Sequence, residues 1–150
     1  MPALPAFPLP ASAPYAATLL RVALGTMWIT HALLKVLVYT LPGAAKFFDA
    51  HGLPGVLVYP VVLAELGGGL LLLLGLHGRI VSLLLMPILA VAAWVHWPNG
   101  WVFSNANGGW EYPVFLLVAS AVHALLGDGA WSVASTLRTT PAATGFKVAA

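Results

Sequence analysis

The sequence predicts an all-α membrane protein, a bundle of four transmembrane helices with both termini in the cytoplasm. Of its 150 residues, 61% are hydrophobic and 7% are charged, whereas about 25% of residues are charged in an average soluble domain. Four long apolar segments account for this composition, and three polar breaks separate them. A helix needs about 20 apolar residues to cross a hydrocarbon core of about 30 Å, so four crossings fill most of the chain.

The four apolar segments are expected to form one domain over residues 15–126. They cover residues 15–39, 56–76, 80–97 and 111–126. Backbone N–H and C=O groups find no water in lipid, so apolar segments of this length satisfy their hydrogen bonds internally and are helical. No soluble catalytic domain fits in the residues that remain.

Neither end of the chain predicts a packed element. Residues 1–14 are rich in proline and lack a basic stretch, and their small residues precede the first apolar segment, so a cleaved secretory signal is not expected. Residues 127–150 consist largely of Gly, Ala, Thr and Ser, and we expect a flexible tail there.

The few basic residues predict the orientation. Arg21, Arg79, Arg138 and Lys147 would lie on one side of the membrane and only Lys46 on the other. Because cytoplasmic loops carry the excess of Lys and Arg, both termini of this multi-pass protein are expected on the cytoplasmic side. The breaks at 40–55 and 98–110 then face outward, and the first is predicted to form a short interfacial helix.

Several kinds of chemistry are excluded by composition. The chain has no cysteine, which removes thiolate nucleophiles, disulfide exchange and Cys-ligated clusters. It also lacks a basic cluster for nucleic acid, a dinucleotide-binding motif and a c-type haem attachment motif. Any redox role therefore depends on a bound molecule or on a partner protein.

Five ionisable residues are predicted to gather in the outer half of the bundle. They are His31, Lys35, Glu65, His96 and Glu111. An ionisable group in hydrocarbon costs about 2.5–3.5 kcal/mol on the insertion scale, so these side chains are expected to face the interior of the bundle.

Each of these residues also has a purely structural interpretation. Glu65 would pair with Lys35, His31 or Arg79 only to hold helices together, beside a small-residue contact made by Ala64 and Gly68. Lys35 would extend to the interface. His31 and His96 would be hydrogen-bonded groups at helix ends, and Glu111 would favour a helix start. The remaining histidines, His51, His77 and His123, are predicted to lie at the interface or the surface.

Four stretches of the chain together resemble a known family. These are His31 with Lys35, the segment AELGGGLLLLLGLHGR at 64–79, and the motifs VHWPNG (95–100) and NGGWEYP (107–113). They resemble the DoxX family of small four-helix membrane proteins of bacteria and archaea over about residues 19–127. The resemblance implies a multi-pass protein of a bacterial or archaeal cytoplasmic (inner) membrane. The resemblance implies a membrane subunit of a thiosulfate:quinone oxidoreductase or a quinol oxidase, or a membrane partner of superoxide-detoxifying or sulfurtransferase proteins. Larger relatives in fold use cysteines, which this chain lacks.

We therefore expect an outward-facing pocket that binds a quinone headgroup or another small redox-active molecule. His96, Glu65 and Glu111 would act as the catalytic groups, since a His with a carboxylate can manage protons when electrons arrive. His31, Lys35, Trp97, Asn99, Trp101 and Trp110 would bind the ligand, with the last four as its cover.

Other functions stay open at this stage. The protein could instead be a scaffold that recruits a soluble or membrane redox partner, or a transporter of a small molecule. It could also bind a metal ion, because His and carboxylate side chains suit Zn, Mn or Fe. No ligand-type spacing supports the metal, so no metal ligand is assigned. The lipid bilayer is the one partner that composition predicts, and homo-oligomerisation is not decided by the sequence.

Overall fold

The computed structural model describes residues 10–139, whose regular elements are all helices; this part of the chain contains no strand. The elements are α1 (Ala13–Leu33), the π-helix η1 (Leu34–Val38), α2 (Leu41–Ala50), the 3₁₀ turn η2 (Gly55–Leu57), α3 (Val58–Leu74), α4 (Gly78–His96), the 3₁₀ turn η3 (Trp97–Asn99), α5 (Glu111–Leu126) and α6 (Val133–Thr139). The predicted all-α class is confirmed over this part of the chain.

Three helical stretches among the described residues are long and apolar enough to cross a membrane. They are Ala13–Val38, Gly55–Leu74 and Gly78–Asn99. The fourth predicted segment forms α5, which is apolar but has 16 residues. At a rise of 1.5 Å per residue it is about 24 Å long, somewhat short of a hydrocarbon core of about 30 Å.

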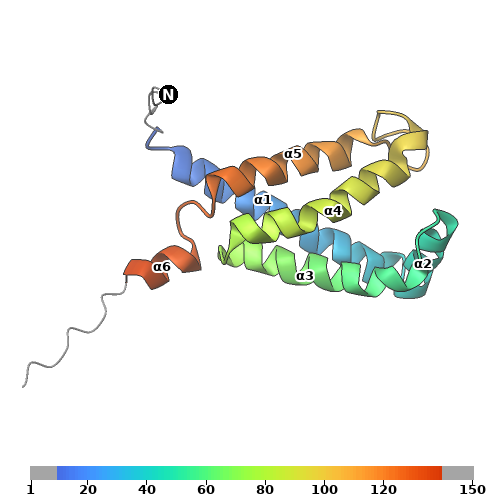
Figure 1. Ribbon diagram of the computed structural model, residues 1–150, viewed down its shortest axis with the longest axis horizontal. Helices are drawn as coiled ribbons and strands as arrows, with labels where there is room; N and C mark the ends of the chain where they lie inside the picture. Colours follow the sequence, from blue (N-terminus) through green and yellow to red (C-terminus); the bar gives the residue numbers. More distant parts are fainter. Residues whose placement is uncertain (1–9, 140–150) are drawn as a thin grey trace, which may run out of the picture.

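The helices run antiparallel to their sequence neighbours and give the bundle two distinct ends (Figure 1). One end, here the loop end, carries α2 and the connection from α4 to α5 at residues 97–110. The opposite end, here the tail end, carries the start of α1 and α6. Along the bundle α1 packs mainly against α3, and α4 packs mainly against α5, while α3 also contacts α4.

Glycines let α1 and α3 approach closely. A Cβ atom at Gly25 would lie 2.9 Å from the backbone oxygen of Gly69, and a Cβ atom at Gly69 would lie 2.9 Å from the oxygen of Gly25. Gly68 instead faces Leu85 of α4, and Ala64 is exposed. The close contact predicted for Ala64 and Gly68 is therefore made by Gly68 and Gly69, each against a different helix.

The apolar core falls into two clusters. The larger one joins α1, α3, α4 and α5 through Leu24, Trp28, Leu72, Val81, Leu85, Leu89 and Leu116. The smaller one, of Ala32, Ala44, Val58 and Val62, holds α2 against α1 and α3. Because α2 packs through its buried Ala44, it is held in a fixed position at the loop end. It is the short helix that the sequence predicted within residues 40–55.

The segment after α5 makes specific contacts at the tail end. Asp128 Oδ1 accepts a hydrogen bond from the amide of Gly78 at the start of α4 (2.9 Å), and Thr18 Oγ1 donates to the carbonyl of Ala130 (2.6 Å). The amide of Ala134 donates to the carbonyl of Gly75 at the end of α3 (3.4 Å). Composition predicted a flexible tail from residue 127, whereas residues 127–134 link α1, α3 and α4.

Candidate functional site

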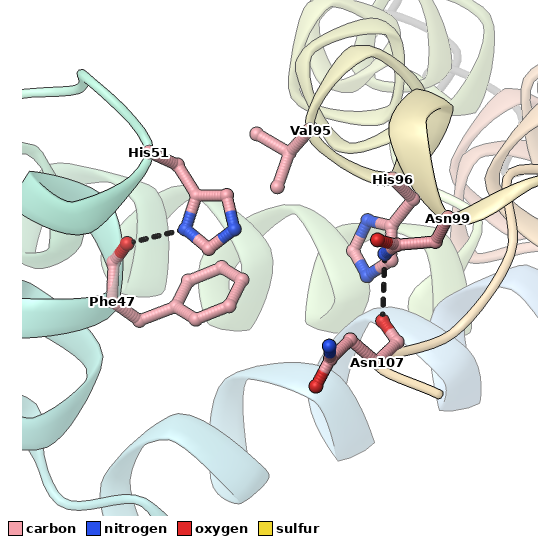
Figure 2. A pocket seen from close by; sticks show the side chains of 6 residues that line it. All are labelled: Phe47, His51, Val95, His96, Asn99 and Asn107. Atoms are coloured by element: carbon pink, nitrogen blue, oxygen red, sulfur yellow. Dashed lines mark hydrogen bonds between the residues drawn. The ribbon is translucent and has the colours of Figure 1, made fainter. Parts of the chain in front are cut away.

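A cavity of about 250 Å³ lies at the loop end, between α2 and the 97–110 connection. It is lined by Phe47, His51, Val95, His96, Asn99 and Asn107, and we refer to it as the loop-end cavity. Figure 2 shows the rings of His51 and His96 on opposite sides of it. Ligand pockets for drug-sized molecules occupy about 300–1,000 Å³, so this cavity suits a ligand that consists of a single six-membered ring with small substituents.

Local hydrogen bonds hold both walls of the loop-end cavity in place. On one side, His51 ends α2, and Asp49 Oδ1 accepts from the amide of Gly55 (2.8 Å), which fixes the turn into α3. On the other side, Asn99 Nδ2 donates to the carbonyl of Asn107 (3.1 Å), so the connection folds back on itself.

Gly108 allows the connection to approach His96. Its φ is +79°, in the left-handed region that favours glycine, and a Cβ atom there would lie 3.2 Å from His96 Cδ2. A larger residue would therefore strain the backbone and crowd the imidazole. Gly108 of the NGGW motif thus has a physical role in building the wall of the cavity.

The histidine rings at the loop-end cavity are oriented by their own helices. His51 Nδ1 lies 2.8 Å from the carbonyl of Phe47, and His96 Nδ1 lies 2.8 Å from the carbonyl of Ala92. In each ring the Nε2 edge is consequently turned away from the helix that carries it. The ring of Phe47 packs 4.1 Å from that of His51 and provides an apolar wall.

Lys35 and Glu65 form an ion pair between η1 and α3. Lys35 Nζ donates to both carboxylate oxygens of Glu65, at 2.7 and 2.8 Å. The Glu65 side chain is 3% exposed and that of Lys35 20% exposed. Lys35, His31 and Arg79 were the predicted partners of Glu65, and Lys35 is the one that pairs with it. The π-helical turn is a local deviation of the kind often found at functional positions, and it carries the lysine.

His31 lies near this pair and outside the lining of the loop-end cavity. Its Nδ1 lies 2.9 Å from the carbonyl of Met27, and its ring stacks on Tyr112 at 6.0 Å. It is close enough to Glu65 to interact with it electrostatically. It therefore joins α1 to the start of α5.

Glu111 faces a different hollow from His96, although both lie at the loop end. Its Oε1 accepts a hydrogen bond from the amide of Phe103 (2.8 Å), which fixes the connection from α4. It lines an open, mainly apolar hollow of about 410 Å³ together with Trp101, Phe103, Tyr112, Val114 and Phe115. The structure thus separates Glu111 from the loop-end cavity.

The three tryptophans of the predicted cover pack on one another. Trp97 stacks on Trp110 at 4.5 Å, and Trp101 meets Trp110 edge-on at 4.4 Å. Trp97 and Trp101 are more than half exposed. Large exposed aromatic rings are typical of the membrane–water interface, so this cluster suits contact with headgroups. Of the predicted cover, Asn99 is the member that lines the loop-end cavity.

A second group of buried polar residues lies at the tail end. Arg21 is 2% exposed and donates to the carbonyl of Trp131 (3.3 Å), and His123 is fully buried with its Nδ1 2.8 Å from Ser82 Oγ. The prediction that His123 lies at the surface is therefore wrong, because α5 turns it toward α4. Periodicity placed it on an apolar helix but could not fix the helix rotation.

The described residues contain no group of three or more His, Cys, Asp and Glu side chains suited to hold a metal ion. The five residues expected in one pocket occupy three places. Lys35, Glu65 and His31 lie on η1, α3 and α1, His96 lines the loop-end cavity, and Glu111 lines the open hollow. Sequence reasoning missed His51. The signal available for it was its place at the end of an amphipathic segment in the break at 40–55.

Comparison with known proteins identifies the family. The sequence profile of the DoxX family matches residues 16–97, over half of the chain. The chain belongs to the DoxX family. In this DoxX protein the match covers α1 to α4 and includes Lys35, Glu65, His51 and His96, while Asn99 and Asn107 lie beyond it.

A similar protein of Bacillus subtilis (strain 168) carries the name "Putative oxidoreductase CatD". It is 39% identical to this DoxX protein over 66 residues, which amounts to 44% of this chain and 48% of that protein. The chain thus matches about half the length of this relative. No solved structure matches.

Proposed function

We propose that this DoxX protein serves a redox system in the membrane and binds a quinone headgroup, or a similar small aromatic redox molecule, in the loop-end cavity. The observation that carries the proposal is the placement of His51 and His96 on opposite sides of one small cavity. The family and a relative named as an oxidoreductase support the redox role.

The chemistry of the cavity lining suits such a ligand. Phe47 and Val95 supply an apolar surface for a ring, and the two histidines with Asn99 and Asn107 supply hydrogen-bonding groups. Pockets for small molecules combine these features, and histidine is the side chain most often used to take or give a proton near neutral pH. Because the chain has no cysteine, electrons pass between the bound molecule and a partner protein.

In this proposal the ion pair of Lys35 and Glu65 has a structural role. It joins η1 to α3, and the smaller core cluster holds α2 on the same two helices. Glu65 and Lys35 thereby position the wall that carries His51. Glu111 acts on the other wall, through its hydrogen bond to the connection.

The experiment that tests the proposed function is the identification of the molecule that copurifies with the protein in mild detergent, by its mass and absorbance. We expect an aromatic redox molecule to be retained by the wild type and lost from His51→Ala/His96→Ala. Glu111→Gln is the matched control, since its amide oxygen still accepts from Phe103 and the residue does not line the cavity. Retention by the double-alanine variant would reject the site.

A membrane scaffold is the second candidate function, favoured by the tail end. There α6 extends from the bundle (Figure 1), and Trp131 beside it is 78% exposed. A soluble partner could bind this surface without any ligand in the loop-end cavity. If the protein is a scaffold, His51→Ala/His96→Ala should bind the partner as the wild type does, whereas truncation after Gly127 should abolish partner binding.

The proposed orientation places the loop end outside and the tail end in the cytoplasm of a bacterial or archaeal cell. Ser104 and Ser12 are exposed at opposite ends, and the absence of cysteine allows each to be labelled as a single, nearly isosteric cysteine. In intact cells we expect an impermeant thiol reagent to label Ser104→Cys and to spare Ser12→Cys. The reverse pattern would invert the topology.

A further inference from the structure

The two histidines of the loop-end cavity present hydrogen-bond acceptors, not donors. The Nδ1 atom of each ring is 2.8 Å from a backbone carbonyl of its own helix, at Phe47 for His51 and at Ala92 for His96. A carbonyl only accepts, so each Nδ1 carries the proton. A neutral imidazole has one N–H, and its Nε2 is then an acceptor with a free lone pair. Within residues 10–139, neither Nε2 has a hydrogen-bond partner.

The rest of the cavity lining offers hydrogen-bond donors only through the side-chain amides of two asparagines. Asn99 directs one N–H of its amide at the carbonyl of Asn107, which leaves its side-chain oxygen as an acceptor and its second N–H as a donor. Phe47 and Val95 are apolar, and no Lys, Arg, Asp or Glu lines the cavity. The carboxamide of Asn107, which is exposed, can donate or accept. The cavity lining thus contains no carboxylate, ammonium or guanidinium group, and two of its acceptors are the imidazole nitrogens.

A quinone and its reduced form differ in what they offer such a site. The oxygens of a quinone are carbonyls that only accept, so they would leave both Nε2 atoms unpaired. The reduced form has two O–H donors, one for each ring. A site built from acceptors discriminates against a ligand that lacks the donors, because its polar groups then stay unpaired.

We infer that the loop-end cavity selects para-dihydroxylated aromatic molecules, hydroquinones, over the corresponding quinones. The inference rests on the proposed function and makes it more specific, since it names the oxidation state that binds. The DoxX protein would then receive the reduced molecule, and His51 and His96 would hold its two hydroxyl groups on opposite sides of the ring.

The test compares tetramethylhydroquinone with tetramethylbenzoquinone, whose substituted ring resists addition of lysine. Binding to the purified, full-length protein in mild detergent is measured without oxygen by equilibrium dialysis. We expect a Kd at least tenfold lower for the hydroquinone, a difference of about 1.4 kcal/mol. In His51→Leu/His96→Leu the preference should disappear, and in His77→Asn, at the exposed tail-end turn, it should persist.

Three other outcomes would overturn the inference in distinguishable ways. Equal or tighter binding of the quinone would reject selection of the reduced form while leaving the proposed function intact. Binding of neither compound at millimolar concentration would reject both. Binding that requires added Zn²⁺ and is lost with a chelator would make the histidine pair a metal site instead.

Discussion

Lys35→Met is expected to lower the stability of the bundle by about 3–5 kcal/mol, because it leaves the carboxylate of Glu65 buried without its partner. Glu65 is 2% exposed and accepts both of its side-chain hydrogen bonds from Lys35. The loss is measured by thermal unfolding in mild detergent, followed by helical circular dichroism. Lys46→Met is the matched control. That lysine is exposed on α2, and its replacement should change stability by no more than about 0.5 kcal/mol.

The double variant Lys35→Met/Glu65→Leu tests whether the ion pair has only a structural role or is also needed for ligand binding. Replacing both members of a buried pair by apolar side chains is often neutral or stabilising. If the pair only joins η1 to α3, we expect the double variant to regain wild-type stability and to keep its ligand. Losses that add in the double variant would show that the two residues do not act as a pair.

The fold was largely predictable from the sequence because lipid restricts the chain so strongly. Apolar segments of this length have to be helical, and the breaks at 40–55 and 98–110 were marked by glycine, proline and amides. The tail end was less predictable. Its contacts come from single hydrogen bonds, such as that from Gly78 to Asp128, and a weakly apolar composition gives no sign of them.

The candidate site was only partly predictable, since periodicity fixes a face of a helix but not the rotation of one helix against another. His96 and Glu111 lie at the same end of the bundle, yet their side chains face different hollows. The π-helical turn at Lys35 shifts that residue relative to a regular helix, and nothing in the local sequence predicts it. His51 enters the site because α2 packs on α1 and α3 through a contact distant in sequence.

Val95→Trp is expected to abolish ligand binding while leaving the fold intact. Val95 lines the loop-end cavity and is only half-buried near the end of α4, so an indole ring there can fill a space of about 250 Å³ without disturbing the core. We expect at least a hundredfold loss of affinity, since little room for a ligand ring remains. Val118→Trp is the matched control, because Val118 is 54% exposed on α5 and lines neither hollow.

Photoaffinity labelling with an azido-substituted quinol, followed by mass spectrometry of the labelled peptides, tests most directly whether the loop-end cavity is the ligand site. In membranes that contain the wild type or Val118→Trp, we expect label at residues 47–51 and 95–107, and we expect none in Val95→Trp. Three results would contradict the assignment of the site. They are label around Lys35 and Glu65, label at Trp101 and Phe115 of the open hollow, and equal labelling of Val95→Trp and the wild type.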